Sequence, residues 1–145
     1  MLAIREAAAV LIGLAKNRED AKINSQAVPK FCFISPADDY ISLPGEKVAK
    51  QDIDLQARIL SMGKLHPVLA ITGGICIGVA AKIPGTLVNE VVGHAAEKDE
   101  LNIGHCSGVL SVGAKVNIHD GEIQVENGTV YRTARVLMKG NVELN

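Results

Sequence analysis

The spacing of hydrophobic and polar residues predicts one helix, one strand and two polar segments in the first third of the chain. Small and aliphatic residues recur at helical spacing over Ala3–Lys16, which predicts a helix, and the polar segment Asn17–Ala27 reads as a connector. The apolar run Lys30–Ile34 lies between two prolines and predicts a short strand. The stretch Ala37–Gln51 contains Asp, Gly and Pro, and we expect an exposed loop there.

The middle of the chain contains its longest apolar run, Val68–Ala81, which predicts a buried central element with a helix over Gly73–Lys82. Before it, Asp52–Leu60 has an N-cap residue and apolar residues at helical spacing, with Gly63 as a stop, and predicts a second helix. A strand is the alternative for that segment. Val88–Val92 predicts a further strand.

The second half of the chain changes to a period of two, which is typical of strands. Apolar and polar residues alternate over Val109–Val116, Asp120-Gly121 is a hairpin signal, and Glu122–Glu126 continues as a second strand. Asn127-Gly128 predicts another turn. Further strands are expected over Thr129–Val136 and Met138–Leu144. Together these elements predict one α+β domain, in which a curved antiparallel sheet surrounds a buried central helix.

Composition restricts the class of protein. The chain has 145 residues, enough for a single domain, and its 48% hydrophobic and 21% charged residues indicate a folded globular chain. A net charge of −1 without a basic stripe argues against nucleic acid as a partner. Three cysteines without close pairing favour a reducing, cytoplasmic compartment. The central apolar run is shorter than the roughly 18 residues of a membrane span, so we expect no membrane partner.

The start of the central helix carries the clearest candidate chemistry. Thr72, Gly73 and Gly74 open the predicted helix, and the first N–H groups of a helix have no partners within it and attract anions. Lys64 and His66 precede this point in a Gly-containing turn. One interpretation is a solvated Lys and a locally bonded His. The other places both beside the helix start, where Lys64 pairs with a carboxylate and His66 donates a hydrogen bond or moves a proton.

Other motifs point away from nucleotides and metals. Gly73 and Gly78 have the spacing of a phosphate loop, but Val79 stands where that loop requires Lys. The four histidines and three cysteines show no zinc-binding spacing, so we expect no metal. Cys76, inside the apolar run, is expected to be a buried inert thiol.

The segment Gly104–Gly108 reads GHCSG and is similar to a nucleophile elbow with Cys106 at its centre. That elbow requires a strand before it and a helix after it, whereas an alternating strand is predicted here. A Gly-rich loop that enters a hairpin is the favoured interpretation. A Cys106 nucleophile, which would make the chain a cysteine hydrolase, and a His–Cys pair that lines a site are the alternatives.

Four ordered motifs resemble a known family, the PrpF-type 2-methylaconitate cis-trans isomerases and 4-oxalomesaconate tautomerases. The motifs are DIDLQARILSMGKLH, TGGICIGVAAKIPGT, NIGHCSGVLSVGAKV and VYRTARVLMKGNV, and NSQAVPKFCFISP also fits the pattern. This family has the diaminopimelate epimerase-like fold, with two similar lobes and an active site between them. The resemblance covers nearly the whole chain and implies that residues 1–145 are the C-terminal lobe, without the N-terminal lobe.

The resemblance also implies a set of site residues on one wall of the cleft. The substrate-facing turn would contain Ser61, Met62, Gly63, Lys64 and His66, and the carboxylate-binding helix start would contain Thr72, Gly73 and Gly74. The Lys and Cys that the family uses for proton transfer would lie on the absent lobe, which leaves His66 as the only weak catalytic candidate here. Family members usually carry Pro at the position of Cys106, so this thiol is a departure.

The implied reaction is an allylic proton shift in an unsaturated di- or tricarboxylate, with no cofactor. The partners expected are the small carboxylate and either the N-terminal lobe or a second copy of the chain, because removal of one lobe exposes apolar surface. The alternative functions are a non-catalytic remnant that still binds carboxylates and, with less support, the cysteine hydrolase that uses Cys106.

Overall fold

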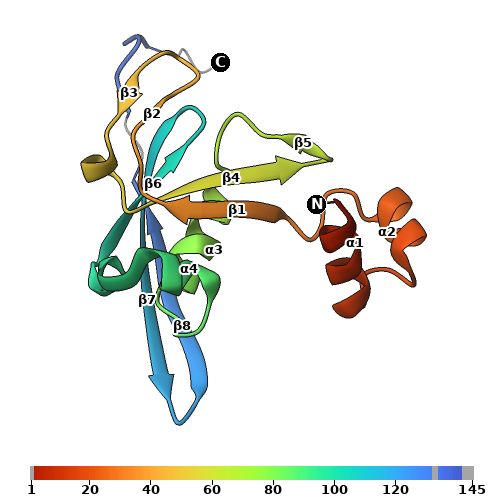
Figure 1. Ribbon diagram of the computed structural model, residues 1–145. Coiled ribbons are helices and arrows are strands. Elements are labelled where there is room, and N and C mark those ends of the chain that lie inside the picture. The colour runs from red at the N-terminus through yellow and green to blue at the C-terminus, as the bar shows by residue number, and fades with distance from the viewer. Residues whose placement is uncertain (1, 132–133, 142–145) are drawn as a thin grey trace.

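A curved six-stranded sheet forms the centre of the computed structural model, which describes residues 2–131 and 134–141 (Figure 1). The main strands follow the order β1-β4-β6-β7-β8, and β5 pairs with β4 at one end. Their bounds are Phe31–Pro36 for β1, Leu55–Ser61 for β4, Lys64–Leu65 for β5, Glu100–His105 for β6, Gly108–His119 for β7 and Glu122–Val130 for β8. The predicted α+β class and curved sheet are confirmed.

One pair of neighbouring strands departs from the expected antiparallel pattern. Strands β4 and β6 are parallel, while all other neighbours in this sheet are antiparallel. Parallel strands require a crossover connection, and here the crossover contains the helices α3 (Ile71–Ala81) and α4 (Leu87–Val92) and the short 3-10 helix η2 (Gly93–Glu97). The parallel pair therefore places α3 against the sheet.

The remaining elements lie at the periphery. Helices α1 (Leu2–Leu11) and α2 (Arg18–Asn24) pack on each other beside the start of β1 (Figure 1). Strands β2 (Tyr40–Ile41) and β3 (Lys47–Val48) pair as a small ribbon, followed by the 3-10 helix η1 (Lys50–Asp52). None of the helices among the described residues has the length and apolar content that a membrane span needs.

The core lies between α3 and the sheet. The largest fully buried side chains are Leu55, Leu101, Ile103 and Val112, all on strands β4, β6 and β7. Helix α3 contributes one buried face, formed by Gly74, Ile77, Gly78 and Ala81. The predicted central helix is confirmed, but the run is buried on one side only.

Two expectations about that apolar run are wrong. The thiol of Cys76 is exposed, because it lies on the face of α3 opposite the sheet. Val68 and Ile71 also expose part of their side chains. A high apolar content along a helix therefore does not show that the whole helix is enclosed.

Glycines allow α3 to approach the sheet closely. A Cβ atom on Gly74 would lie 2.6 Å from Cδ2 of Leu110, and one on Gly78 would lie 3.1 Å from Cγ2 of Val112. On the facing strand, a Cβ on Gly128 would lie 2.6 Å from Cγ2 of Ile75. The spacing of four residues between Gly74 and Gly78 puts both on the same side of the helix, facing β7.

Three predicted elements have the wrong type. Asp52–Leu60 is not a helix: β4 runs from Leu55 to Ser61, buries alternate residues and pairs on both sides, as the strand alternative expected. Val88–Val92 is not a strand, because the hydroxyl of Thr86 accepts from the N–H of Asn89 and begins α4. The connector Asn17–Ala27 contains α2, since the side chain of Asn17 caps it.

The C-terminal strands also differ from the expectation. Asp120-Gly121 forms the predicted hairpin turn, with φ of 52° and 82°. Asn127-Gly128 is not a turn, because β8 continues to Val130 and Gly128 is needed for the approach of Ile75. Residues 131 and 134–141 contain no strand, while parts of the predicted strands Thr129–Val136 and Met138–Leu144 lie outside the described residues.

The contact between Gly74 and β7 leads to a stability prediction. Gly74→Val should lower the free energy of unfolding by about 1–3 kcal/mol, the usual cost of overpacking a closed contact. Urea denaturation followed by circular dichroism measures this change. Gly140→Ala is the matched control, because no atom lies within 4 Å of a Cβ added there. Equal stability of Gly74→Val and the wild type would contradict close packing at this position.

Candidate functional site

A hollow of about 670 Å³ lies where the start of α3 meets the hairpin between β6 and β7. Its walls come from the loop before α3, the first residue of the helix, the hairpin and the residue after β8. The lining residues are Val68, Leu69, Ala70, Ile71, His105, Val109, Leu110, Ser111 and Tyr131. The wall is mostly apolar and contains a few polar groups, which is typical of small-molecule sites.

The start of α3 presents unpaired donors at this hollow. The N-cap residue is Ala70, whose side chain cannot accept a hydrogen bond. The first backbone bond of the helix runs from the N–H of Gly74 to the carbonyl of Ala70, with an N···O distance of 2.9 Å. The N–H groups of Ile71, Thr72 and Gly73 precede this bond and have no acceptor within the helix. Their partial positive charge favours a carboxylate.

His105 is the titratable side chain in the wall of the hollow. The backbone N–H of Ser107 donates to its Nδ1 at 3.1 Å, so in the neutral ring the proton is on Nε2. Burial lowers the pKa of His105, and the positive charge of Arg58 lowers it further. The imidazole is therefore neutral at pH 7 and has an Nε2–H group to donate to an anionic oxygen.

The hairpin turn that carries His105 is held by Tyr40. The hydroxyl of Tyr40 lies 2.8 Å from the carbonyl oxygen of His105 and 2.7 Å from that of Gly108, so its single proton is shared between the two. Arg58 stacks over the Tyr40 ring, with Cζ 4.9 Å from the centroid, and donates to the carbonyl of Gly104 at 3.0 Å. These contacts fix the position of the turn.

Two further hydrogen bonds connect the turn to its surroundings. The N–H of Leu43 donates to the carbonyl of Cys106 at 2.6 Å. The hydroxyl of Ser107 donates to the carbonyl of Pro67 at 2.7 Å. Because Pro67 lies in the loop that leads into α3, the second bond holds His105 in a fixed position relative to the helix start.

The predicted turn Ser61–Lys64 lies elsewhere. It connects β4 to β5, with φ of 49° at Met62 and 78° at Gly63. Met62 and Gly63 line a separate hollow of about 170 Å³ together with residues of α1 and α2. Buried Arg5 also lines this second hollow, but its guanidinium donates to the carbonyls of Ala21 and Val28 and thereby holds α1 on α2.

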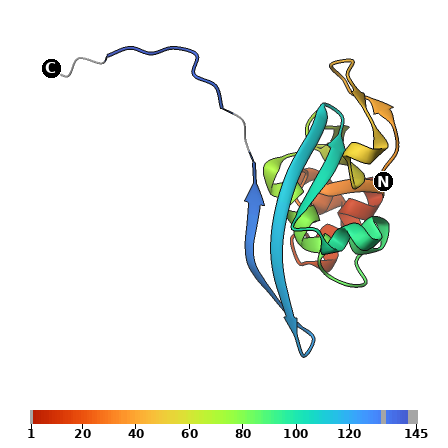
Figure 2. The ribbon, with the colours of Figure 1, turned by 90° about the vertical axis from the view of Figure 1, so that its left-hand side faces the viewer.

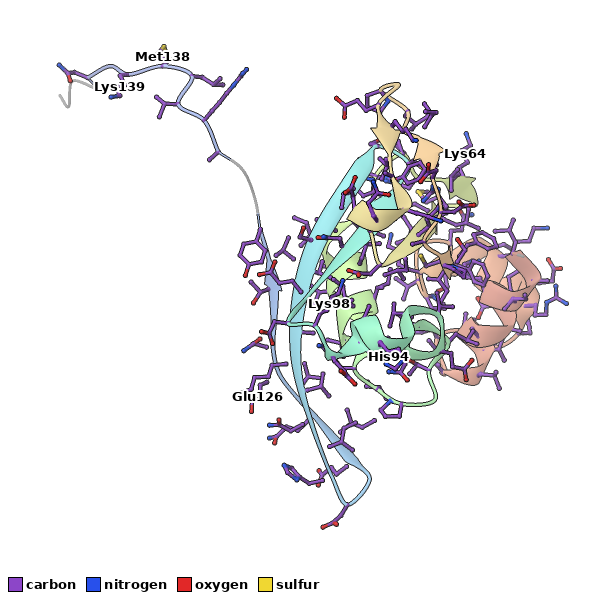
Figure 3. All side chains as sticks on the ribbon, turned by 60° about the vertical axis from the view of Figure 1, so that its left-hand side comes forward. Lys64, His94, Lys98, Glu126, Met138 and Lys139 are labelled. Atoms are coloured by element: carbon purple, nitrogen blue, oxygen red, sulfur yellow. The ribbon has the colours of Figure 1, made fainter. Side chains whose placement is uncertain are left out.

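The structure separates Lys64 and His66 from the lining of the larger hollow. Lys64 is exposed on β5, at the outside of the molecule (Figure 3). The backbone N–H of His66 donates to the carbonyl of Ile59 at 2.9 Å, and its Nδ1 lies 3.3 Å from the nitrogen of Val68. His66 thus adjoins the loop that forms the wall, and the role of both side chains in substrate binding stays a prediction.

The structure narrows down which backbone N–H groups at the start of α3 are available to a ligand. Thr72 is exposed in the first turn of α3, and Gly73 follows it. Gly74 is buried against Leu110, and its N–H is already bonded within the helix. The donors that can face a ligand therefore belong to Ile71, Thr72 and Gly73.

Sequence reasoning did not assign His105, Ser111 or Tyr131 to the site. His105 appeared only within the GHCSG motif, as half of a possible His–Cys pair. The loop interpretation of that motif is confirmed, because Gly108 begins β7 where a nucleophile elbow requires a helix. The structure therefore removes the basis of the Cys106 nucleophile.

No group of three or more His, Cys, Asp or Glu side chains within residues 2–131 and 134–141 has the arrangement that holds a metal ion.

Comparisons with known proteins identify relatives over nearly the whole chain. The family model described as PrpF protein matches residues 1–145. The chain is 46% identical over 136 residues to a 2-methyl-aconitate isomerase of Cupriavidus necator, covering 94% of this chain and 34% of that protein. It is 38% identical over 140 residues to a 3-methylitaconate isomerase of Eubacterium barkeri, covering 96% of this chain and 36% of that protein. The chain thus spans about a third of the length of these relatives.

A solved structure supports the fold. The crystal structure of a methylitaconate-delta-isomerase superposes with a TM-score of 0.77 at 32% identity, covering 90% of this chain and 35% of that one. The α+β fold with its curved sheet is therefore diaminopimelate epimerase-like, as the sequence motifs implied.

The lowered pKa of His105 predicts a pH dependence of stability. In the unfolded state His105 has a pKa of about 6.5 and binds a proton more readily than in the folded state. The free energy by which neutral His105 favours the folded state is therefore fully present above pH 6.5. It is lost as the pH falls through the folded pKa of His105. Unfolding free energies of the wild type should therefore fall more steeply below pH 6.5 than those of His105→Asn, which keeps an acceptor for Ser107.

Urea titrations at a series of pH values between 5 and 8 measure this difference. His119→Asn is the control, because His119 is exposed near the tip of the β7–β8 hairpin, and its profile should match the wild type. Parallel profiles for the wild type and His105→Asn would contradict a half-buried His105 whose pKa is lowered in the folded state.

Proposed function

This chain belongs to the PrpF protein family, and from that premise we propose that it forms one lobe, the C-terminal one, of an isomerase that acts on unsaturated di- and tricarboxylates. The names of the relatives, 2-methyl-aconitate isomerase and 3-methylitaconate isomerase, support this substrate class. Because the chain spans about a third of the length of these relatives, we infer that it works as part of a larger active unit. Three free cysteines suit a cytoplasmic enzyme.

The observation that carries the proposal is the uncapped start of α3 at a hollow lined by His105. The N–H groups of Ile71, Thr72 and Gly73 provide a fixed array of donors, and Ala70 provides no side chain to compete for them. His105 lines the same hollow, and its neutral ring has an Nε2–H group that can act as a further donor. A carboxylate bound between them exchanges its hydration for preorganised donors in a partly apolar site.

The proposed reaction is an allylic proton shift, either a cis-trans isomerisation or a tautomerisation. A base removes a proton from the carbon next to the double bond, and the electrons of that C–H bond form a dienolate whose charge spreads onto a carboxylate. An acid then returns a proton one or two carbons along, so that atoms and charge balance without a cofactor. In this scheme the groups that move the proton lie on the part of the enzyme outside this chain.

This lobe contributes orientation and charge stabilisation. Donors aimed at the carboxylate oxygens become more effective as negative charge accumulates on them, which lowers the barrier. The hydrogen bonds from Tyr40 and Ser107 keep the His105 turn fixed, so the donors need little reorganisation during the reaction. The apolar wall formed by Val109 and Leu110 excludes water from the carbon skeleton.

Removal of one N–H donor tests the carboxylate site directly. Ile71→Pro deletes the N–H of the first helical residue, a position where Pro fits a helix. Ala70 already has φ of −61° and ψ of 140°, the conformation that a following Pro requires. Since hydrogen bonds to charged groups contribute about 1.5–3 kcal/mol, we expect cis-aconitate to bind about ten- to hundredfold more weakly.

Isothermal calorimetry of the wild type and the variant measures this loss. Ile71→Ala is the matched control, because it removes the side chain but keeps the N–H, and it should bind like the wild type or nearly so. Equal affinities of Ile71→Pro and Ile71→Ala would place the carboxylate elsewhere. If binding behaves as expected, mixing the chain with the remaining two thirds of the Cupriavidus necator relative and measuring isomerisation distinguishes an active lobe from a non-catalytic remnant.

A further inference from the structure

The turn between β6 and β7 is contacted by side chains from the face of the sheet opposite α3. Along β4 the buried core residues occupy one face, and Gln56 and Arg58 alternate with them and occupy the other. Figure 2 shows the β2–β3 ribbon at the end of the molecule where this turn lies. Tyr40, the first residue of that ribbon, and Arg58 therefore approach the turn from outside the core.

Gly104 allows the Tyr40 ring to lie directly on β6. A Cβ atom on Gly104 would lie only 3.1 Å from Cε1 and from the hydroxyl oxygen of Tyr40. The neighbours Ile103 and His105 are directed to the side of α3, because side chains alternate along a strand. Tyr40 thus binds the carbonyls of His105 and Gly108 on the face away from the hollow and leaves the imidazole free.

The guanidinium of Arg58 orients the Tyr40 ring. Its Cζ lies 4.9 Å from the ring centroid, and its Nη1 donates to the carbonyl of Gly104 at 3.0 Å. Its Nη2 donates to Oε1 of Gln56 at 3.0 Å, and the amide of Gln56 donates to the carbonyl of Asp38 at 3.1 Å, two residues before Tyr40. A planar fork with several donors can make these contacts together, whereas the compact ammonium of a lysine cannot.

Arg58 also places a positive charge near His105. In the described part of the chain the ion pairs do not include Arg58, so no carboxylate neutralises it there. Burial lowers the pKa of His105, and the charge of Arg58 lowers it further. The other titratable groups around the turn and the hollow are Tyr40, His66, Cys106 and Tyr131.

We propose that Arg58 is a positioning residue for the carboxylate site. Through Tyr40 and the carbonyl of Gly104 it holds the β6–β7 turn, and with it the His105 ring, beside the start of α3. This inference rests on the proposed function for the purpose of the turn, while the contacts of Arg58 provide its geometry. Arg58 needs no contact with substrate, because it acts from the opposite face of the sheet.

Two substitutions of Arg58 separate its geometry from its charge. Arg58→Met removes the charge and all donors, whereas Arg58→Lys keeps the charge but lacks the planar fork. In both variants the N–H of Ser107, which donates to Nδ1 of His105, should exchange with solvent about fivefold faster, as expected for a weakened hydrogen bond. Only Arg58→Met should bring the pKa of His105 closer to its ordinary value of about 6.5, because only this variant removes the charge.

Amide and imidazole NMR spectra of the ligand-free chain between pH 5 and 8 measure both effects, and His105→Asn identifies the ring signals. Tyr40→Phe removes only the hydroxyl and should also speed exchange at Ser107, which keeps the test decisive if Arg58→Met does not fold. Lys30→Met is the matched control, because it removes one positive charge from an exposed residue outside these contacts. It should change neither the exchange nor the titration.

The expected result is faster exchange confined to the β6–β7 turn. An Arg58→Lys variant that exchanges like the wild type would overturn the proposal, because charge without the fork would then be sufficient. Equal acceleration of amides throughout β4 and β6 would also overturn it, since it would show a general loss of stability.

Calorimetry with cis-aconitate connects the position of the turn to binding. Arg58→Lys should bind about fivefold more weakly than the wild type, because the His105 donor is no longer fixed. Equal affinities, despite faster exchange at Ser107, would overturn the role of Arg58 in the site. A wild type that does not bind cis-aconitate would contradict the proposed function instead, and the ligand-free spectra would still decide whether Arg58 positions the turn.

Discussion

The close approach of α3 to β7 and β8 is the contact on which the rest of the structure depends. Interdigitated side chains normally fill the space between a helix and the sheet on which it packs. Here Gly74, Gly78 and Gly128 remove Cβ atoms at the points of contact, so Leu110, Val112 and Ile75 pack against the backbone. The parallel pairing of β4 with β6 requires a crossover, and the crossover supplies this helix. The sheet topology thus supplies the helix, and the glycines determine how closely it packs.

The same contact determines what the site can do. Because the glycines hold α3 against β7, its first turn lies beside the β6–β7 hairpin, and Ile71, the first residue of the helix, lines the same hollow as His105. The hydroxyl of Tyr40 holds the hairpin turn through the carbonyl of His105, and the hydroxyl of Ser107 connects the turn to the carbonyl of Pro67 in the loop before α3. The proposed carboxylate site therefore consists mainly of backbone donors at a fixed helix end. The side chains of Tyr40 and Ser107 hold the neighbouring hairpin turn in place.

The sequence predicted the elements whose local signals agree with their surroundings. The alternation before Asp120-Gly121 and the turn itself gave the β7–β8 hairpin, and the apolar run ending at Pro84 gave α3. It failed at Asp52–Leu60, because Leu55 and Ile59, four residues apart, fit a helix and a strand equally, and pairing with β1 and β6 decides between them. His105 was not assigned to the hollow, since its position depends on hydrogen bonds from residues distant in sequence, above all that of Tyr40. The family motifs identified the relatives and assigned substrate contacts both to the start of α3 and to the turn Ser61–Lys64. That turn adjoins α1 in the fold, and its role in substrate binding stays a prediction.

The central claim is that the first turn of α3 and His105 bind the carboxylate together. Backbone amide NMR spectra recorded during a titration with cis-aconitate test it most directly. The account predicts that the largest shifts fall on the N–H groups of Ile71, Thr72 and Gly73 and on the His105 ring, with smaller changes at Gly74, whose N–H is already bonded. Shifts concentrated at Met62, Gly63 and Lys22, around the smaller hollow, would contradict it.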